Sequence, residues 1–448
     1  MRAARGWSRR SVFGAVLGTA GALAIGKSVP AAAAPGSRED ARMAARLDAH
    51  IDIAVRESDF SGAVLLAKHG RTILARATGF ACRDHGVPNG IETKFNLGSI
   101  SKTFTATAIL RLAEQGRLRL DAPVSAILRD YPDPDIARRI TVEQLLTHSS
   151  GLGNYWEAIA ARPTHAFSEL ADYVPLFRGA ALEFEPGTRF GYSNVGYVVL
   201  GLIVEAVTGT SYFDHVRTTI FEPLGMSATE SWPLDLVVPG RATGFTRDEQ
   251  RPGVWRNNIF VNAFRGNSAG GGYSTAADLT RFAQALAGDR LFARATRETA
   301  TRGRFPYAKG QYGLGFSEEI VNGHRIVGHT GGHIGIASEV MVFEDLGWTL
   351  ALLTNGDVDG YWSVNAFVKD LLCGESMSTS HYRHSMALAA AAQEDGVNAA
   401  RVLHERRAPG TEARPGVLEV EAAKARHRGR SEAAERIGAL VEAIGGVP

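Results

Sequence analysis

The sequence predicts an α/β fold in which an antiparallel sheet is flanked by helices and interrupted by an all-helical insertion. Two β-hairpin patterns support this prediction, one over residues 62–75 and one over residues 338–353, near opposite ends of a 448-residue chain. The segments between them are mostly helical in pattern. Sheet segments at both ends with a helical insertion between them imply an α/β sandwich, and we expect the active site at their seam.

Residues 1–34 have the layout of an export signal. The twin arginine Arg9-Arg10 precedes an apolar run from Val12 to Ile25, and Ala31-Ala32-Ala33 follows as a cleavage candidate. This pattern is typical of the twin-arginine route. The run covers 14 residues, fewer than the ~20 that a transmembrane helix needs. We therefore expect a periplasmic or extracellular protein whose mature chain has no stable membrane insertion.

A catalytic unit is predicted over residues 38–374, and its elements can be justified in order. Apolar residues at helical spacing mark the helices, and short apolar runs beside Gly-containing turns mark the strands. A capping box, Thr141 followed by Gln144, marks the start of one helix. The expected elements are a helix over 38–57, strands over 62–67 and 72–75, helices over 99–115, 141–147 and 193–208, strands over 325–328, 338–343 and 348–353, and a helix over 360–372.

Beyond the catalytic unit, residues 376–448 change in character. They are rich in Ala, Arg and Glu and poor in aromatic residues, with a break at Ala408-Pro409-Gly410. This composition predicts a helical C-terminal extension of two or three helices. Both packing on the main unit and binding of a partner remain open for it.

The bulk composition excludes several classes of protein. With 49 basic and 47 acidic residues the formal charge is +2, which gives no electrostatic footprint for nucleic acid. Only two cysteines are present, Cys82 and Cys373, so a disulfide framework is excluded. A single bridge between them stays open, and two buried, inert thiols are the simpler expectation.

The segment Ser99-Ile100-Ser101-Lys102 can carry nucleophilic chemistry. In a helix, Ser99 and Lys102 lie one turn apart on the same face. A desolvated lysine can be neutral enough to remove the proton of a serine hydroxyl, and a helix N-terminus directs backbone N–H groups toward a developing oxyanion. Alone, the motif is better explained by a helix cap with an exposed lysine.

Two further segments support the catalytic interpretation. Tyr192-Ser193-Asn194 stands at the start of the long apolar helix, where a phenol can shuttle protons and an amide can hold a substrate carbonyl or orient the lysine. His329-Thr330-Gly331-Gly332 follows the strand over 325–328, and its small residues allow a substrate backbone to lie alongside. A core aromatic and a helix cap are the structural alternatives for Tyr192 and Asn194.

On these motifs the chain resembles the serine β-lactamase and D-alanyl-D-alanine peptidase superfamily over roughly residues 40–374. It is most similar to the branch of class C β-lactamases, carboxypeptidases with His-Thr-Gly and β-lactamase-like esterases, and a β-lactamase/transpeptidase-like fold is implied. The stretches that carry the resemblance are Lys94–Thr105, Gln144–Leu152, Gly191–Tyr197 and Gly270–Thr275.

The resemblance implies a role for each motif residue. Ser99 is the expected nucleophile, Lys102 the base during acylation, and Tyr192 the proton shuttle to the leaving group. The implied substrate-binding residues are Asn194, His329, Thr330 and Gly331, and the implied oxyanion hole consists of the backbone N–H groups of Ser99 and Gly332. No cofactor is expected.

One departure bears on the substrate. Many β-lactamases of the superfamily carry a lysine where this chain has His329, and a mostly neutral histidine attracts a β-lactam carboxylate less strongly. We therefore expect cleavage of an amide or ester bond in a small-molecule or peptidoglycan-peptide substrate, in the manner of a D-alanyl-D-alanine carboxypeptidase. A β-lactamase-like esterase or weak β-lactamase is the alternative, followed by a non-catalytic penicillin-binding sensor.

Other candidate residues receive structural interpretations. Gly266-Asn267-Ser268-Ala269-Gly270 matches the nucleophile elbow of α/β-hydrolases, but no buried strand precedes it and glycines follow it, so we expect a loop beside the active site. His148 is expected to hydrogen-bond within a tight turn. His329 and His333 are four residues apart, but the intervening Thr-Gly-Gly does not favour a helix, and no metal site is predicted.

Overall fold

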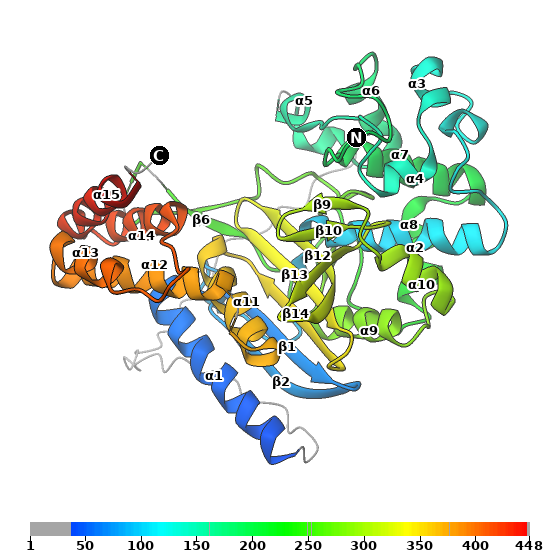
Figure 1. Cartoon of the computed structure of the whole chain (residues 1–448). Coiled ribbons are helices and arrows are strands. Elements are labelled where there is room, and N and C mark those ends of the chain that lie inside the picture. The colour runs from blue at the N-terminus through cyan, green and yellow to red at the C-terminus, as the bar shows by residue number, and fades with distance from the viewer. Residues whose placement is uncertain (1–36, 161, 249, 252, 376, 446–448) are drawn as a thin grey trace, which may run out of the picture.

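The computed structural model describes residues 37–160, 162–248, 250–251, 253–375 and 377–445, so the predicted export signal lies outside the described residues. An eight-stranded antiparallel sheet forms the centre of the molecule (Figure 1). In spatial order its strands are β2 (Arg71–Thr78), β1 (Gly62–Lys68), β14 (Trp348–Thr354), β13 (Ile336–Phe343), β12 (His324–His333), β11 (Ser317–Val321), β10 (Gly310–Tyr312) and β9 (Phe305–Tyr307).

The sheet joins the two ends of the catalytic unit. β1 pairs with β14 from Gly62 opposite Thr354 to Lys68 opposite Trp348. The two hairpins expected near opposite ends of the unit are therefore neighbours in one sheet, and the predicted α/β class with an antiparallel sheet is confirmed.

Both faces of the sheet are buried. Because successive side chains of a strand point to opposite faces, each central strand contributes side chains to two cores. In β1, Ala63 and Leu65 enter the core on one face, whereas Val64 and Leu66 enter the core on the other. The second face is covered by α1 (Arg38–Ser58) and α11 (Val358–Cys373), and the first by α9 (Ala276–Ala287) and α2 (Ser101–Glu114). This three-layer packing explains why the central strands are apolar at nearly every position.

The helical insertion packs beside α2 and forms part of the first core (Figure 1). Its predicted capping box is present, since Gln144 and Thr141 exchange hydrogen bonds at the start of α4. The insertion contains η2 (Val124–Ala126), α3 (Pro134–Arg139), α4 (Val142–Leu146), α5 (Trp156–Ala160), η3 (Thr164–Ala166), η4 (Leu170–Tyr173), α6 (Val174–Phe177), α7 (Asn194–Thr208), α8 (Tyr212–Val216) and η5 (Arg217–Phe221).

The remaining elements are short. Three two-stranded sheets pair β3 with β4, β5 with β8, and β6 with β7. The bounds are β3 (Phe80–Cys82), β4 (Val87–Pro88), β5 (Phe95–Asn96), β6 (Phe245–Arg247), β7 (Trp255–Asn257), β8 (Tyr273–Ser274) and α10 (Arg294–Thr301).

The start of α2 differs from the prediction of a helix from Ser99. Gly98–Ile100 forms a 3-10 turn, η1, and the α-helix begins at Ser101. Gly98 adopts φ +49°, and a Cβ there would lie 2.8 Å from the backbone nitrogen of Gly332. Close approach of β12 therefore requires a glycine at this point and tightens the first turn.

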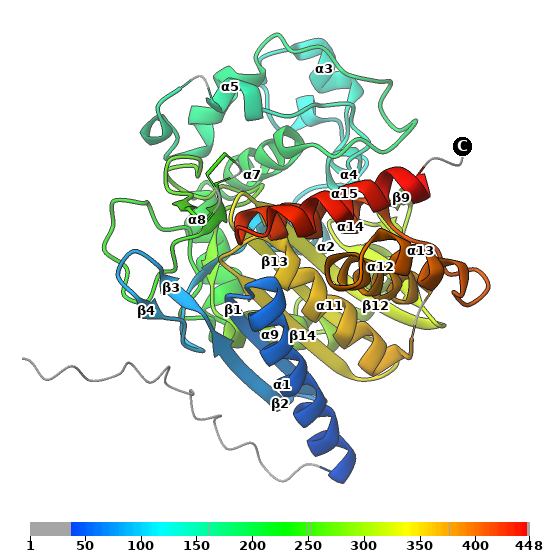
Figure 2. The same cartoon turned by 90° about the vertical axis from the view of Figure 1, so that its left-hand side faces the viewer.

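Within residues 377–445 the C-terminal extension forms four helices, so the expectation of two or three was wrong. They are α12 (Met377–Glu394), α13 (Val397–Glu405), α14 (Pro415–His427) and α15 (Ser431–Gly445). Leu388, Leu418, Ile437 and Leu440 lie in a core that these helices form among themselves. The bundle lies beside α11 and packs on the main unit (Figure 2).

Two further findings concern the described part of the chain. Both cysteines are free, with Cys373 buried and Cys82 partly exposed. In residues 37–445, apart from the gaps given above, no single helix has the length and hydropathy needed to cross a membrane. Taken as a pair, α7 and Tyr212–Phe221 meet these two criteria, but the pair is bent by 80°.

Candidate active site

Ser99 and Lys102 lie together at the N-terminal end of α2. Nζ of Lys102 is 3.0 Å from Oγ of Ser99. Nζ also donates hydrogen bonds to Oδ1 of Asn194, at 2.7 Å, and to the backbone carbonyl of Ala269, at 2.5 Å. The pair predicted from one helical turn thus exists, with a third group supplied by α7.

Burial favours the neutral form of Lys102. The side chain of Lys102 is fully buried, and desolvation holds its pKa well below the usual 10.5. A neutral amine has two N–H bonds, which the Asn194 and Ala269 oxygens accept, and one lone pair. That lone pair is left for the hydroxyl proton of Ser99, which is the arrangement that activates a serine nucleophile.

Tyr192 completes the proton-handling group. Nζ of Lys102 lies 4.8 Å from the centre of the Tyr192 ring. Desolvation raises the pKa of the Tyr192 phenol well above 10, and its side-chain interaction with Ser99 opposes that rise. The phenol therefore keeps its proton at neutral pH, and it lies beside the Ser99 hydroxyl.

The orientation of Asn194 is fixed by Asn154, a residue that the sequence motifs did not indicate. Oδ1 of Asn154 accepts hydrogen bonds from the backbone N–H and from Nδ2 of Asn194, at 3.0 and 2.8 Å. Because Nδ2 faces Asn154, Oδ1 of Asn194 faces Lys102. Nδ2 of Asn154 in turn donates to the carbonyl of Tyr192.

The backbone of β12 passes close to Ser99. A Cβ at Gly331 would lie 1.9 Å from the carbonyl oxygen of Leu97, so only glycine permits this contact. Ser99 and Gly332, whose backbone N–H groups are the predicted oxyanion donors, both line one pocket.

A small pocket of about 60 Å³ opens beside Ser99. Among the described residues that line it, none is Lys, Arg, Asp or Glu. Its wall is aromatic and aliphatic with a few amides, and its members include Asn96, Tyr155, Trp156, Tyr173, Asn194, Trp232, Leu234 and Ile336.

With this geometry established, comparison with known proteins identifies the family. The model of the family described as Beta-lactamase matches residues 44–371. The chain belongs to the β-lactamase family. The protein is thus a serine hydrolase of the β-lactamase fold, as the motifs predicted.

Among the relatives, penicillin-binding protein 4* of Bacillus subtilis is 31% identical over 316 residues, which cover 67% of this chain and 69% of that protein. Esterase EstB of Burkholderia gladioli is 38% identical over 206 residues, 42% of this chain and 52% of the esterase. A penicillin-binding protein of Bacillus halodurans has a similar structure, with a TM-score of 0.66 and 28% identity over 72% of this chain and 99% of that one.

In this β-lactamase-family hydrolase, His329 and Thr330 face opposite sides of β12. His329 is buried, and its Nε2 lies 2.9 Å from the hydroxyl of Tyr312. Desolvation lowers the pKa of His329 to about 3, so the ring is neutral. Thr330 instead faces α11, opposite Glu339 in the register, and its side chain interacts with Tyr307.

His148 supports Tyr192 within the hydrolase. It occupies a turn with φ +55°, and its Nδ1 accepts a hydrogen bond from the backbone N–H of Ser193 at 3.1 Å. Its ring packs against that of Tyr192, with centres 4.1 Å apart and an interplanar angle of 32°. Burial holds the pKa of His148 well below 6.5, so a neutral imidazole packs behind the phenol.

The competing serine of the hydrolase belongs to a loop, as expected. Ser268 is fully buried, and a Cβ at Gly201 of α7 would lie 2.5 Å from its Oγ. Its carbonyl oxygen accepts a hydrogen bond from Thr105, at 2.7 Å. The loop contributes to the site through the carbonyl of Ala269, which binds Lys102.

The described residues contain no group of three or more His, Cys, Asp or Glu side chains that could hold a metal ion. His333 lies at the end of β12 and stacks on Trp156 with ring centres 5.2 Å apart. Its Nε2 is 3.0 Å from the carbonyl of Val261, so this histidine forms part of the pocket rim.

Proposed function

We propose that the hydrolase cleaves esters or amides of short, uncharged acyl groups through an acyl-enzyme on Ser99. The observation that carries this proposal is the buried Lys102, whose amine lies 3.0 Å from the Ser99 hydroxyl and whose pKa burial holds well below 10.5. General-base activation of this kind typically contributes ~10²- to 10⁴-fold to a rate.

In the proposed mechanism, Lys102 accepts the Ser99 proton while Oγ attacks the substrate carbonyl. The backbone N–H groups of Ser99 and Gly332 stabilise the oxyanion, an effect that is typically about 3 kcal/mol per donor. Tyr192 delivers a proton to the leaving group as the bond breaks. Water then attacks the acyl-enzyme, and Ser99 recovers its proton.

The pocket beside Ser99 supports the choice of acyl group. Its volume of about 60 Å³ accommodates a short chain, and its wall has no charged side chain among the described residues to pair with an ionised acyl group. An acetyl or butyryl group fits these limits. A bulky or charged acyl group would lose solvation without gaining a partner.

Cleavage of a D-alanyl peptide is the second candidate, and the similarity to penicillin-binding protein 4* favours it. The surroundings of Thr330 weigh against it, since the neighbouring Glu339 is a buried carboxyl group whose pKa burial raises, and it offers a substrate carboxylate no cation. His329 is neutral at physiological pH and adds no attraction. Only slow turnover of β-lactams is expected for the same reason.

A substrate panel tests the proposal. Wild type and Ser99→Ala are compared on p-nitrophenyl butyrate, on a D-alanyl-D-alanine peptide and on penicillin, together with labelling by a fluorophosphonate probe. We expect turnover of the butyrate ester and loss of both turnover and label in Ser99→Ala. Persistent labelling of the variant would refute Ser99 as the nucleophile, and preferential release of D-alanine would select the second candidate.

We also propose that residues 1–34 direct export through the twin-arginine route, on the sequence pattern alone. Replacing Arg9 and Arg10 by Lys should retain the precursor in the cytoplasm, and fractionation of cells that express both forms measures this. Unchanged export of the double variant would contradict the proposal.

A further inference from the structure

A large cavity lies on the α11 face of the sheet, between the catalytic unit and the C-terminal bundle. Its volume is about 620 Å³, within the range of about 300–1,000 Å³ that is typical of small-molecule sites. Strand residues of β9 to β13 form one wall, α11 forms a second, and residues 416–424 of α14 form a third. Of the described residues that line it, none also lines the pocket beside Ser99, so the cavity is separate from the catalytic site.

Apolar side chains face this cavity without being covered. Trp362 of α11 is 48% exposed, Val420 of α14 is 38% exposed, and both line the cavity. Val358, the first residue of α11, also lines it and is 43% exposed. A ligand that covers these side chains removes apolar surface from water, which is favourable. The α11 and α14 walls therefore suit the apolar body of a ligand.

Three cations also line the cavity. Lys309 lies in the turn between β9 and β10, Lys369 lies on α11, and Arg414 immediately precedes α14. Desolvation lowers the pKa of Lys309, and the charges of Arg414 and Lys369 lower it further. The three cations are therefore near enough to act on one another, although they come from three separate elements.

Nearby carboxyl groups offset this charge only in part. Glu319 binds Lys369 at 2.6 Å, and Glu339 lies 3.9 Å from the same amine. Both counteract the lowering of the pKa of Lys309 without cancelling it. Glu339 is 5% exposed, and burial raises its pKa, which favours the uncharged form. Three cations and at most two carboxylates thus leave this end of the cavity with a net positive charge.

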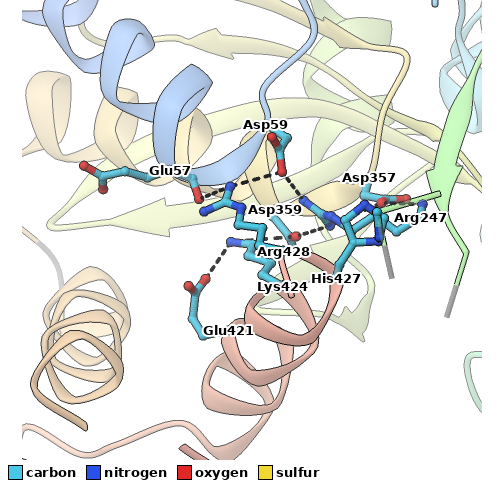
Figure 3. A network of polar contacts seen from close by, with 10 residues as sticks. Glu57, Asp59, Arg247, Asp357, Asp359, Glu421, Lys424, His427 and Arg428 are labelled. Carbon is cyan, nitrogen blue, oxygen red and sulfur yellow. Dashed lines mark hydrogen bonds and ion pairs between the residues drawn. The ribbon is translucent and has the colours of Figure 1, made fainter. Parts of the chain in front are cut away.

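The other charged side chains that line the cavity are each paired with an oppositely charged group. The pairs are Glu318 with Arg325 at 2.5 Å, Glu421 with Lys424 at 2.5 Å, and Asp359 with Arg247 at 2.8 Å. Lys424 also reaches Asp359, at 3.7 Å, and so joins α14 to α11 (Figure 3). This network fixes the α14 wall, so the cavity is a defined part of the fold and its surplus charge stays beside Lys309.

We propose that the cavity binds an amphipathic monoanion, in which an alkyl chain carries a carboxylate. The carboxylate lies between Lys309 and Arg414, where the N-terminal end of α14 adds its dipole. The chain lies along Trp362 and Val420. A cationic headgroup would meet the surplus of positive charge, and a phosphate dianion would be repelled by Glu319. The C-terminal extension thus contributes charged and apolar contacts to a second ligand site, which does not depend on the acyl-enzyme proposed above.

Isothermal titration calorimetry of the full-length protein tests the site with three probes that share one chain: decanoate, decanol and decylammonium. We expect decanoate to bind wild type at one site and about tenfold more tightly than decanol, because only the carboxylate gains the charged contacts. Decylammonium should bind no more tightly than decanol.

Two variants with matched controls locate the site. Lys309→Met should remove most of the advantage of decanoate over decanol, whereas Lys94→Met, on a lysine outside the described lining of the cavity, should retain it. Gly416→Trp should weaken both probes about tenfold by steric exclusion, because Gly416 lines the cavity and a Cβ there has no heavy atom within 4 Å. Gly438 on α15 has the same free space outside that lining, so Gly438→Trp should bind as wild type does.

Thermal unfolding identifies a variant that folds poorly, and Arg414→Met or Val417→Trp then repeats the test of the charge or of the space. Absence of decanoate binding to wild type, or equal affinities in the two glycine variants, would overturn the site. Tighter binding of decylammonium than of decanoate, or an unchanged preference for decanoate in both Lys309→Met and Arg414→Met, would overturn the assignment of an anionic ligand.

Discussion

Asn154 orients Asn194 through two hydrogen bonds, accepting from its backbone N–H at 3.0 Å and from its Nδ2 at 2.8 Å. The amide oxygen of Asn194 is thereby turned toward Lys102. A residue of the loop before α5 thus determines which atom the catalytic lysine meets.

Replacing Asn154 by Ala should lower kcat/KM for p-nitrophenyl butyrate by about 10- to 100-fold, because the Asn194 amide is then free to rotate away from Lys102. Steady-state kinetics measure the loss, and thermal unfolding controls for a general defect. Wild-type kinetics in the variant would show that Asn194 is positioned without this partner.

Lys102→Met should reduce kcat about 10³-fold, since the base is removed from a buried site. Lys102→Arg should be no better, because a guanidinium stays charged and cannot accept the Ser99 proton. Stopped-flow measurement of the p-nitrophenol burst isolates acylation. Substantial activity in the arginine variant would rule out a neutral base at this position.

The pH profile should rise on its acid side through the pKa of Lys102, which burial holds well below 10.5. No alkaline limb is expected below pH 10, because the pKa of Tyr192 is raised well above that value and its proton is retained. Profiles of kcat/KM for wild type and Tyr192→Phe test this. The phenylalanine variant should lose about 10²-fold in rate while the acid limb keeps its position.

His329 should make stability depend on pH. Burial lowers its pKa to about 3 in the folded chain, against the ordinary value of 6.5 for histidine. Between these values the unfolded chain binds one more proton, so the contribution of His329 is complete above pH 6.5 and is lost as the pH falls. His329→Gln should reduce the slope of unfolding free energy against pH by about 1.4 kcal/mol per unit in this window. Urea unfolding at pH 4.5, 5.5 and 6.5 gives both slopes, and parallel slopes would contradict a buried neutral ring.

Lys424→Met should weaken the docking of α14 by about 3 kcal/mol, because Glu421 is then left buried without its cation. Arg436→Met removes an exposed pair with Glu432 on α15 and should cost under about 1 kcal/mol. Limited proteolysis of the loop between α13 and α14 compares the two variants. Equal protection would mean that Lys424 does not secure the bundle.

Much of the site could be predicted from local sequence. Ser99 and Lys102 are related by a single turn, and that relation survives even though the first turn is a 3-10 turn and α2 starts two residues later than expected. Tyr192 and Asn194 were found because they stand at the cap of a long apolar helix. The spacing of residues along the sequence is therefore enough to predict site residues that share one helix or one helix cap.

The residues that were missed depend on contacts between distant segments. Nothing in the sequence around Asn154 shows that its amide reaches Asn194. The group of Ala269 that binds Lys102 is a backbone carbonyl, which every residue has, so the residue type does not reveal its role. The fold prediction succeeded for the two hairpins because their strands are short apolar runs beside Gly-containing turns. The four-helix extension was undercounted because its Ala-rich sequence marks helix breaks only weakly, and its docking depends on buried ion pairs such as that of Lys424.

The pairing of β1 with β14 has a consequence for biosynthesis. More than 290 residues separate Gly62 from its partner Thr354, so the sheet cannot close while the ribosome still holds the second half of the chain. The nascent serine motif is made early and has no β12 beside it until that half emerges. Premature termination before residue 354 should therefore yield an inert polypeptide with an open strand edge, vulnerable to aggregation and dependent on chaperones.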